Sequence, residues 1–139
     1  MEKKIYEIEI DESVTGKQRP RMNTTTGRAY TPMKTKNYEY LARQVFIYKY
    51  PHFIPIEGKV KLSIIAYFEL PKKRSKLQEA EMLGGLIRPT KKPDWDNIGK
   101  IISDALNKFA FLDDAQIVEA VIIKKYARTP KTIVKIEEI

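Results

Sequence analysis

The sequence predicts a single α+β domain spanning residues 1–139, with a small mixed sheet of about four strands and two principal helices packed on it. Apolar residues occupy every second position from 60 to 70, which is the period of a strand with one buried face. Between 98 and 109 the apolar residues instead recur at intervals of three and four, which is the period of an amphipathic helix. A chain of 139 residues without an internal repeat, a low-complexity tract or a linker fits one hydrophobic core.

The N-terminal part predicts one strand, one long loop and one helix. Residues 5–10 alternate loosely between apolar and polar, which indicates a short strand. Residues 11–31 are polar and carry four positive charges, and they predict a long loop that is either mobile or functional. Thr31 and Pro32 form a favourable helix start, and Pro51 ends that helix. The expected apolar face of the helix consists of Tyr38, Leu41, Ala42, Val45 and Tyr48.

The remainder of the chain predicts a second long helix and two further strands. The strand at 60–70 is followed by a basic segment, residues 71–93, in which residues around 75–83 are compatible with a short helix. The second long helix begins near Asp94, a plausible N-cap, and its apolar stripe needs a core to cover it. Residues 117–123 form a nearly continuous apolar run, which predicts a buried central strand, and residues 132–136 predict a final strand.

The composition points to a polyanionic partner. The chain carries 26 Lys and Arg against 18 Asp and Glu, a net charge of +8. Such a surplus attracts nucleic acid first and an anionic membrane surface second, and the plain alternative is a basic domain without either partner. The absence of cysteine and the single histidine, His52, argue against disulfides, cysteine or histidine zinc sites and Ser-His-Asp catalysis. No signal peptide or membrane span is visible, so we expect a cytoplasmic protein without a membrane partner.

Two acidic clusters stand out against this basic background. One is Asp-Trp-Asp-Asn at residues 94–97, and the other is Asp-Asp at residues 113–114. Lys100 and Asp104 follow Asp96 at four-residue intervals, so the three side chains share one helix face. The helical rise places Asp96 and Asp104 about 12 Å apart, so one ion cannot bind both directly. Asp104 is therefore expected to pair with Lys100 or to support the site, and an ordinary exposed ion-pair ladder is an equally good interpretation of this row.

The D-x-D pattern alone has several meanings. An EF-hand loop is excluded because Ile98 and Ala105 stand where oxygen ligands are needed. Hydrolysis of a phosphodiester gives the acidic residues a purpose, because one or two carboxylates hold Mg²⁺ while open positions remain for water and phosphate. A lysine beside the ion stabilises the transition state. Clustered aspartates repel DNA unless a cation screens them, so their presence in a +8 chain favours a metal site.

Three stretches together resemble the RusA family of Holliday junction resolvases, which are small endonucleases that act as dimers on four-way DNA junctions. The stretches are residues 92–100 (Lys-Pro-Asp-Trp-Asp-Asn-Ile-Gly-Lys), 104–106 (Asp-Ala-Leu) and 112–117 (Leu-Asp-Asp-Ala-Gln-Ile), in the order of the family pattern. The resemblance implies Mg²⁺ as the cofactor, with Mn²⁺ as an alternative ion.

The resemblance also assigns roles to individual residues. It implies metal ligation by Asp94, Asp96 and Asp114, with Lys100 as the catalytic lysine. Asp113 either assists at the site or shapes the turn before the strand. Trp95 is bulkier than the aliphatic residue usual in the family, and we expect it to pack beneath the site, with base stacking as the alternative.

We therefore expect a magnesium-dependent endodeoxyribonuclease that resolves four-way (Holliday) junctions by paired symmetric nicks, in DNA recombination and repair. Two symmetric cuts favour a homodimer with one site in each subunit. Phosphate contacts are expected from Arg19, Arg21, Lys72, Lys73, Arg74, Lys91 and Lys92. The alternatives are a non-catalytic DNA-binding accessory protein of the same fold and a nuclease for other branched DNA, such as flaps or forks.

Overall fold

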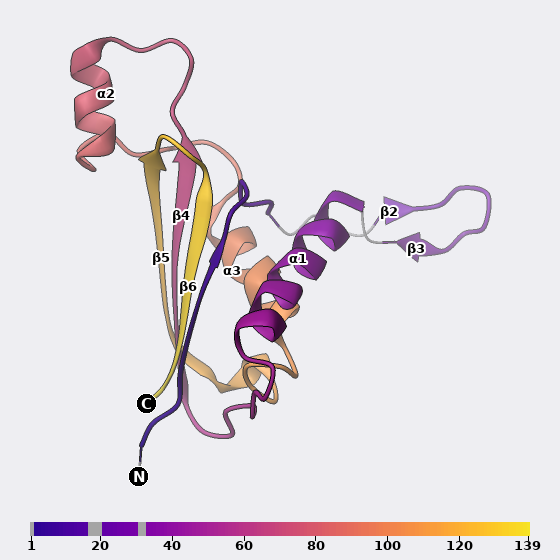
Figure 1. Ribbon diagram of the computed structural model, residues 1–139. Helices are drawn as coiled ribbons and strands as arrows, with labels where there is room; N and C mark the ends of the chain where they lie inside the picture. Colours follow the sequence, from indigo (N-terminus) through magenta and orange to yellow (C-terminus); the bar gives the residue numbers. More distant parts are fainter. Residues whose placement is uncertain (1, 17–20, 31–32) are drawn as a thin grey trace.

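The computed structural model describes residues 2–16, 21–30 and 33–139, and its four long strands form one mixed sheet (Figure 1). These strands are β1 (Ile5–Ile10), β4 (Val60–Glu69), β5 (Ile117–Ala127) and β6 (Lys131–Glu138), in the spatial order β1-β6-β4-β5. β4 runs parallel to β5 and antiparallel to β6, and β6 runs antiparallel to β1. The predicted α+β class with a mixed four-stranded sheet is confirmed.

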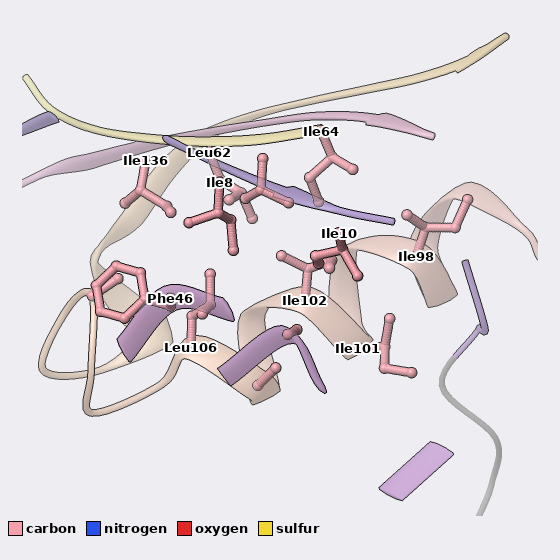
Figure 2. Close-up of a cluster of buried hydrophobic side chains, with 14 of the residues drawn as sticks. Ile8, Ile10, Phe46, Leu62, Ile64, Ile98, Ile101, Ile102, Leu106 and Ile136 are labelled. Carbon is pink, nitrogen blue, oxygen red and sulfur yellow. The ribbon is translucent and has the colours of Figure 1, made fainter. Parts of the chain in front are cut away.

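Two helices, α1 (Met33–Lys49) and α3 (Trp95–Leu106), pack against each other and cover one face of the sheet (Figure 1). Every second residue of β1, β4 and β6 is buried, as the alternating pattern of the sequence requires. Figure 2 shows the labelled side chains of the sheet facing those of the helices: Ile8, Ile10, Leu62, Ile64 and Ile136 opposite Phe46, Ile98, Ile101, Ile102 and Leu106. Full burial of each such side chain contributes on the order of 1.5–3 kcal/mol, which holds α3 firmly on the sheet.

The buried face of α1 differs from the predicted one. Its buried residues are Thr35, Tyr38, Ala42 and Phe46, whereas Tyr48 is 91% exposed. Tyr48 was therefore wrongly assigned to the apolar face, because two adjacent stripes of this helix carry apolar residues. Contact with β1 selects the stripe that contains Phe46, whose ring lies edge-on to Tyr6 at a centroid distance of 5.2 Å.

β5 is an edge strand, so the prediction of a buried central strand at residues 117–123 is wrong. β6 returns between β1 and β4 and takes the central position, which leaves β5 paired with β4 alone. Residues 118–121 are exposed, and Val118 and Val121 retain 57% and 40% of their accessible surface. A continuous apolar run in the sequence does not distinguish a central strand from an edge strand that exposes apolar side chains.

The two edges of the sheet differ in how they are protected. At the β1 edge, the Tyr50 hydroxyl accepts a hydrogen bond from the Glu7 backbone N–H at 2.9 Å, and Lys49 Nζ donates to the Glu7 carbonyl at 2.6 Å. Side chains at the C-terminal end of α1 thus occupy backbone groups of this edge. Over residues 118–121 of β5, the described part of the chain supplies no comparable cover. An open edge of this kind is a template for pairing with another strand.

Two smaller elements lie outside the main sheet. The segment expected as a loop, residues 11–31, contains a hairpin of β2 (Arg21–Met22) and β3 (Ala29–Tyr30), whose turn uses Gly27 at φ +71°. The expected helix start at Thr31 and Pro32 lies outside the described residues. The predicted short helix is confirmed as α2 (Lys76–Leu83), which Ser75 begins with a capping box. No helix among the described residues is long and apolar enough to cross a membrane.

Candidate active site

The first acidic cluster lies at the N-terminal end of α3. Asp94 occupies the N-cap position with extended backbone (φ −70°, ψ 154°), yet its side chain makes no capping hydrogen bond. Asp96 is exposed in the first turn. The buried stripe that begins at Ile98 fixes the rotation of the helix, so both carboxylates remain accessible at its end. Two carboxylates with oxygens not committed to capping are suited to bind a hard cation.

Lys100 follows on the exposed side of α3. Its Nζ lies 4.0 Å from Asp104 Oδ2, the pairing that their four-residue spacing allows. The side chain of Lys100 is 61% exposed, whereas that of Asp104 is 25% exposed. Asp96 lies four residues before Lys100 and Asp104 lies four residues after it. Asp104 is the partner of the lysine, whose head group remains accessible to a phosphate.

The second acidic cluster has a structural member. Asp113 caps the short 3₁₀ helix η1 (Asp114–Gln116). Its carboxylate accepts a hydrogen bond from the Ala115 N–H, and the backbone N–H of Asp113 donates to the Gln116 side chain. Gln116 also donates to the carbonyls of Ile56 and Gly58. These bonds tie the turn to the chain that leads into β4, and they leave Asp114 exposed at the surface.

The chain does not bring the two acidic clusters together. Asp94 precedes α3 and Asp114 follows it, and a helix of 12 residues is roughly 18 Å long. Lys124 Nζ donates to the Lys91 carbonyl, which places the segment before α3 beside the later half of β5, whereas Asp114 lies before its first residue. Among residues 2–16, 21–30 and 33–139, no three acidic or histidine side chains form a group that could hold a metal ion. Asp114 is thus separated from Asp94 and Asp96 within one subunit.

The basic N-terminal loop reaches the first acidic cluster through Gly16. A Cβ atom added at Gly16 would lie 2.6 Å from Pro93 Cβ and 3.1 Å from Asn97 Cβ, so only glycine permits this approach. The loop thus passes directly against the start of α3. Sequence reasoning missed the contacts of Gly16 and Lys124, because both join residues that are distant in the chain; the glycine within a polar segment was the one available signal.

The predicted DNA-binding residues differ in their availability. Arg21, Lys72, Lys73, Lys91 and Lys92 are exposed, and Arg19 lies outside the described residues. Arg74 is engaged, because its guanidinium donates to Glu79 at 2.8 Å and to the Pro71 carbonyl at 2.8 Å. The hydrogen bond from Arg74 holds the pKa of the Glu79 carboxyl below its ordinary value, and Arg128 binds the same oxygen at 3.0 Å. Arg74 therefore helps to hold the segment that contains α2.

Trp95 does not pack beneath the site as expected. It is the first residue of α3, and 67% of its surface is exposed. The expectation is wrong because the core ends at Ile98, one turn further along the helix.

Comparison with known proteins identifies the family of this chain. The family model of Endodeoxyribonuclease RusA matches residues 11–137. A curated relative, the "Uncharacterized protein YqaN" of Bacillus subtilis (strain 168), is 34% identical over 125 residues, and the alignment covers 87% of each chain. The matched region runs from the N-terminal loop into β6 and includes both acidic clusters. The chain therefore belongs to the RusA endodeoxyribonuclease family.

Proposed function

We propose that this nuclease is a magnesium-dependent enzyme that resolves four-way DNA junctions by paired symmetric nicks, and that it acts in recombination and repair. One observation carries the proposal: Asp94 and Asp96 lie exposed at the end of α3, free of capping bonds, with Lys100 one turn away. A non-catalytic DNA-binding protein has no use for carboxylates placed among basic residues, since they repel phosphate.

Asp94 and Asp96 are the residues that hold the ion in this proposal. Mg²⁺ is commonly bound by one or two carboxylates, with water and substrate phosphate completing its shell, so this pair fits it, and Mn²⁺ is the alternative ion. The bound ion supplies a low-pKa water and neutralises charge on the phosphoryl group. Lys100 stabilises the charge that develops on the phosphate oxygens, and Asp104 keeps the lysine on that side of the helix.

The two edges of the sheet support a homodimer. The β1 edge is occupied by Tyr50 and Lys49, whereas residues 118–121 of β5 are open and carry two exposed valines. We place the second copy of the chain on this edge, because pairing there satisfies the backbone and covers Val118 and Val121. A closed two-fold interface also matches two symmetric cuts.

Antiparallel pairing of the two β5 strands changes the position of Asp114. The beginning of one strand then lies beside the end of its partner. Because Lys124 ties the start of α3 to the later half of β5, Asp94 and Asp96 of one subunit approach the end of the sheet where the partner strand begins. We propose that each site combines Asp94 and Asp96 of one subunit with Asp114 of the other, and that Asp113 shapes the turn that presents Asp114.

The direct test is a nicking assay on a synthetic four-way junction, a fork, a flap and a duplex that share arm sequences, with and without Mg²⁺. The expected result is Mg²⁺-dependent cutting of the junction at two symmetric positions. Tight binding of the junction without any cutting in Mg²⁺ or Mn²⁺ would instead identify an accessory DNA-binding protein. Preferred cutting of the fork or flap would identify a nuclease for other branched DNA.

Replacing Lys72 and Lys73 with alanine is expected to weaken junction binding and to make it less dependent on salt. Each phosphate contact contributes about 0.9 to the slope of log K against log salt, so losing two contacts flattens the slope by about two. Arg74→Ala is the matched comparison, because the Arg74 guanidinium is bonded to Glu79 and Pro71. Its slope should stay near that of the unmodified protein. An unchanged slope in the double lysine variant would show that these lysines face solvent in the complex.

A further inference from the structure

Trp95 is the only tryptophan of the chain, and it lies at the surface between Asp94 and Asp96. Tryptophan is strongly buried on average in folded proteins, yet 67% of Trp95 is exposed. With 67% of its surface exposed, the indole contributes little to the packing of this domain. Its open face is available to a ligand that provides a flat apolar surface.

Helix geometry explains why the indole extends beyond the core. Trp95 precedes Ile98 by three residues and Ile102 by seven, so its direction continues the buried stripe of α3. Helical side chains lean toward the N-terminus of the helix. From the first residue of α3, this lean carries the indole past Ile98, the last fully buried residue at this end of the helix. The aromatic surface is thus held by a rigid helix and open to solvent.

The surroundings of Trp95 suit a nucleotide. Lys91 and Lys92 precede it as exposed residues, and the Lys100 side chain, five residues further along α3, is 61% exposed. These cations attract phosphate, and an aromatic face beside them stacks on a base of any identity. Bases within a continuous duplex are already stacked on their neighbours, whereas unstacking is cheapest where pairing is interrupted. A branch point supplies such bases.

We propose that Trp95 stacks on an unstacked base at the branch point, next to the phosphate that is cut, and that this contact favours branched DNA over duplex DNA. The inference rests on the proposed function, because it takes the DNA phosphate to lie at Asp94 and Asp96. It makes Trp95 a residue that positions the substrate and determines structural selectivity.

The single tryptophan provides a direct readout. Its fluorescence is measured by excitation at the red edge of the spectrum, where tyrosine does not absorb, during titration of the full chain with a four-way junction or with a duplex of the same arms. EDTA is present, so that no cutting occurs. Stacking on a base is expected to quench the emission and to reduce quenching by acrylamide with the junction, and to do so much less with the duplex.

Variants separate stacking from folding. Trp95→Ala is expected to weaken junction binding about tenfold to a hundredfold while duplex binding changes little, because one base stack is lost. Trp95→Phe retains an aromatic face and should restore most of the affinity. Tyr48→Ala is the matched control, since it removes a 91% exposed aromatic residue at the far end of α1 and should leave junction binding unchanged.

Two results would overturn the proposal. One is an emission that does not respond to saturating junction DNA. The other is an emission that shifts with protein concentration in the absence of DNA and then no longer responds to DNA, which would make Trp95 a contact between subunits. The proposed function fails separately: if quenching occurs on junction DNA that is never cut in Mg²⁺, the stacking proposal stands and the nuclease mechanism falls. Conversely, the unmodified enzyme could cut the junction normally while the Trp95→Ala variant binds junction and duplex as tightly as before. That result would overturn only the stacking proposal.

Discussion

Asp96→Asn is expected to lower Mg²⁺-dependent cutting of a four-way junction by orders of magnitude, while junction binding in EDTA stays the same or improves. The substitution keeps the size of the side chain and its place in the first turn of α3, but it removes the negative charge that a hard cation needs. It also removes repulsion toward the DNA phosphates, which is why affinity should not fall. Cutting rates and metal-free binding constants, measured on the same junction, separate the two effects.

Asp104→Asn is the internal control for this result. Asp104 lies about 12 Å along the helix from Asp96, too far to share its ion, and it is 4.0 Å from Lys100. Its loss should reduce cutting less than the loss of Asp96, through a less well held lysine. Near-normal cutting by the Asp96→Asn enzyme would rule out the metal site at the end of α3. An equal loss in both variants would show that the ranking of the two residues by geometry is wrong.

Mixing two inactive variants is expected to restore cutting, if each site is shared between subunits. In a dimer of one Asp96→Asn chain and one Asp114→Asn chain, both substitutions fall in the same shared site, and the other site is intact. Random reassociation of equal amounts makes half of the dimers mixed, so about a quarter of the normal number of sites should be active. A mixed dimer has one working site, so a cruciform plasmid should be nicked rather than linearised.

Asp94→Asn mixed with Asp96→Asn is the matched control for subunit mixing. Both residues belong to the same end of α3, so every site in every dimer carries one substitution and no activity should return. Sedimentation of the unmodified protein at micromolar concentration checks that dimers are present to exchange. If the Asp96→Asn and Asp114→Asn mixture, refolded together, stays as inactive as either variant alone, the three aspartates are not shared across subunits in the way proposed.

Several elements of the fold are determined by neighbouring residues in the sequence. The alternation in β4 and the three- and four-residue spacing in α3 each specify one buried face, because the side-chain period of a strand or helix is fixed by its backbone. The capping box of α2 is likewise a contact between Ser75 and Gln78. The same holds for the acidic pair at residues 94–97, whose accessibility follows from the rotation that Ile98 imposes on the helix. Spacing alone sufficed for these features.

Other features were decided by contacts between distant parts of the chain. The apolar run at residues 117–123 does not distinguish a central strand from an edge, and the insertion of β6 beside β4 made β5 an edge. Trp95 was expected to pack beneath the site, but the core ends at Ile98, one turn further along the helix. The sequence also does not show that the guanidinium of Arg74, predicted to contact DNA, is bonded to Glu79.

The candidate site, too, is determined partly by the sequence and partly by the tertiary structure, as the separation of Asp114 from Asp94 and Asp96 shows. The sequence determines which side chains have the chemistry to hold a cation, because ligand type is a property of the residue. Their distances depend on where the chain on either side of α3 is held. The segment before the helix is held at the later half of β5 by Lys124, and the turn after the helix is held ahead of β4 by Gln116. The two ends of this 12-residue helix, with their aspartates, therefore stay apart. Packing of the whole chain, rather than any local pattern, therefore decides that one subunit presents the acidic clusters at opposite ends of one helix.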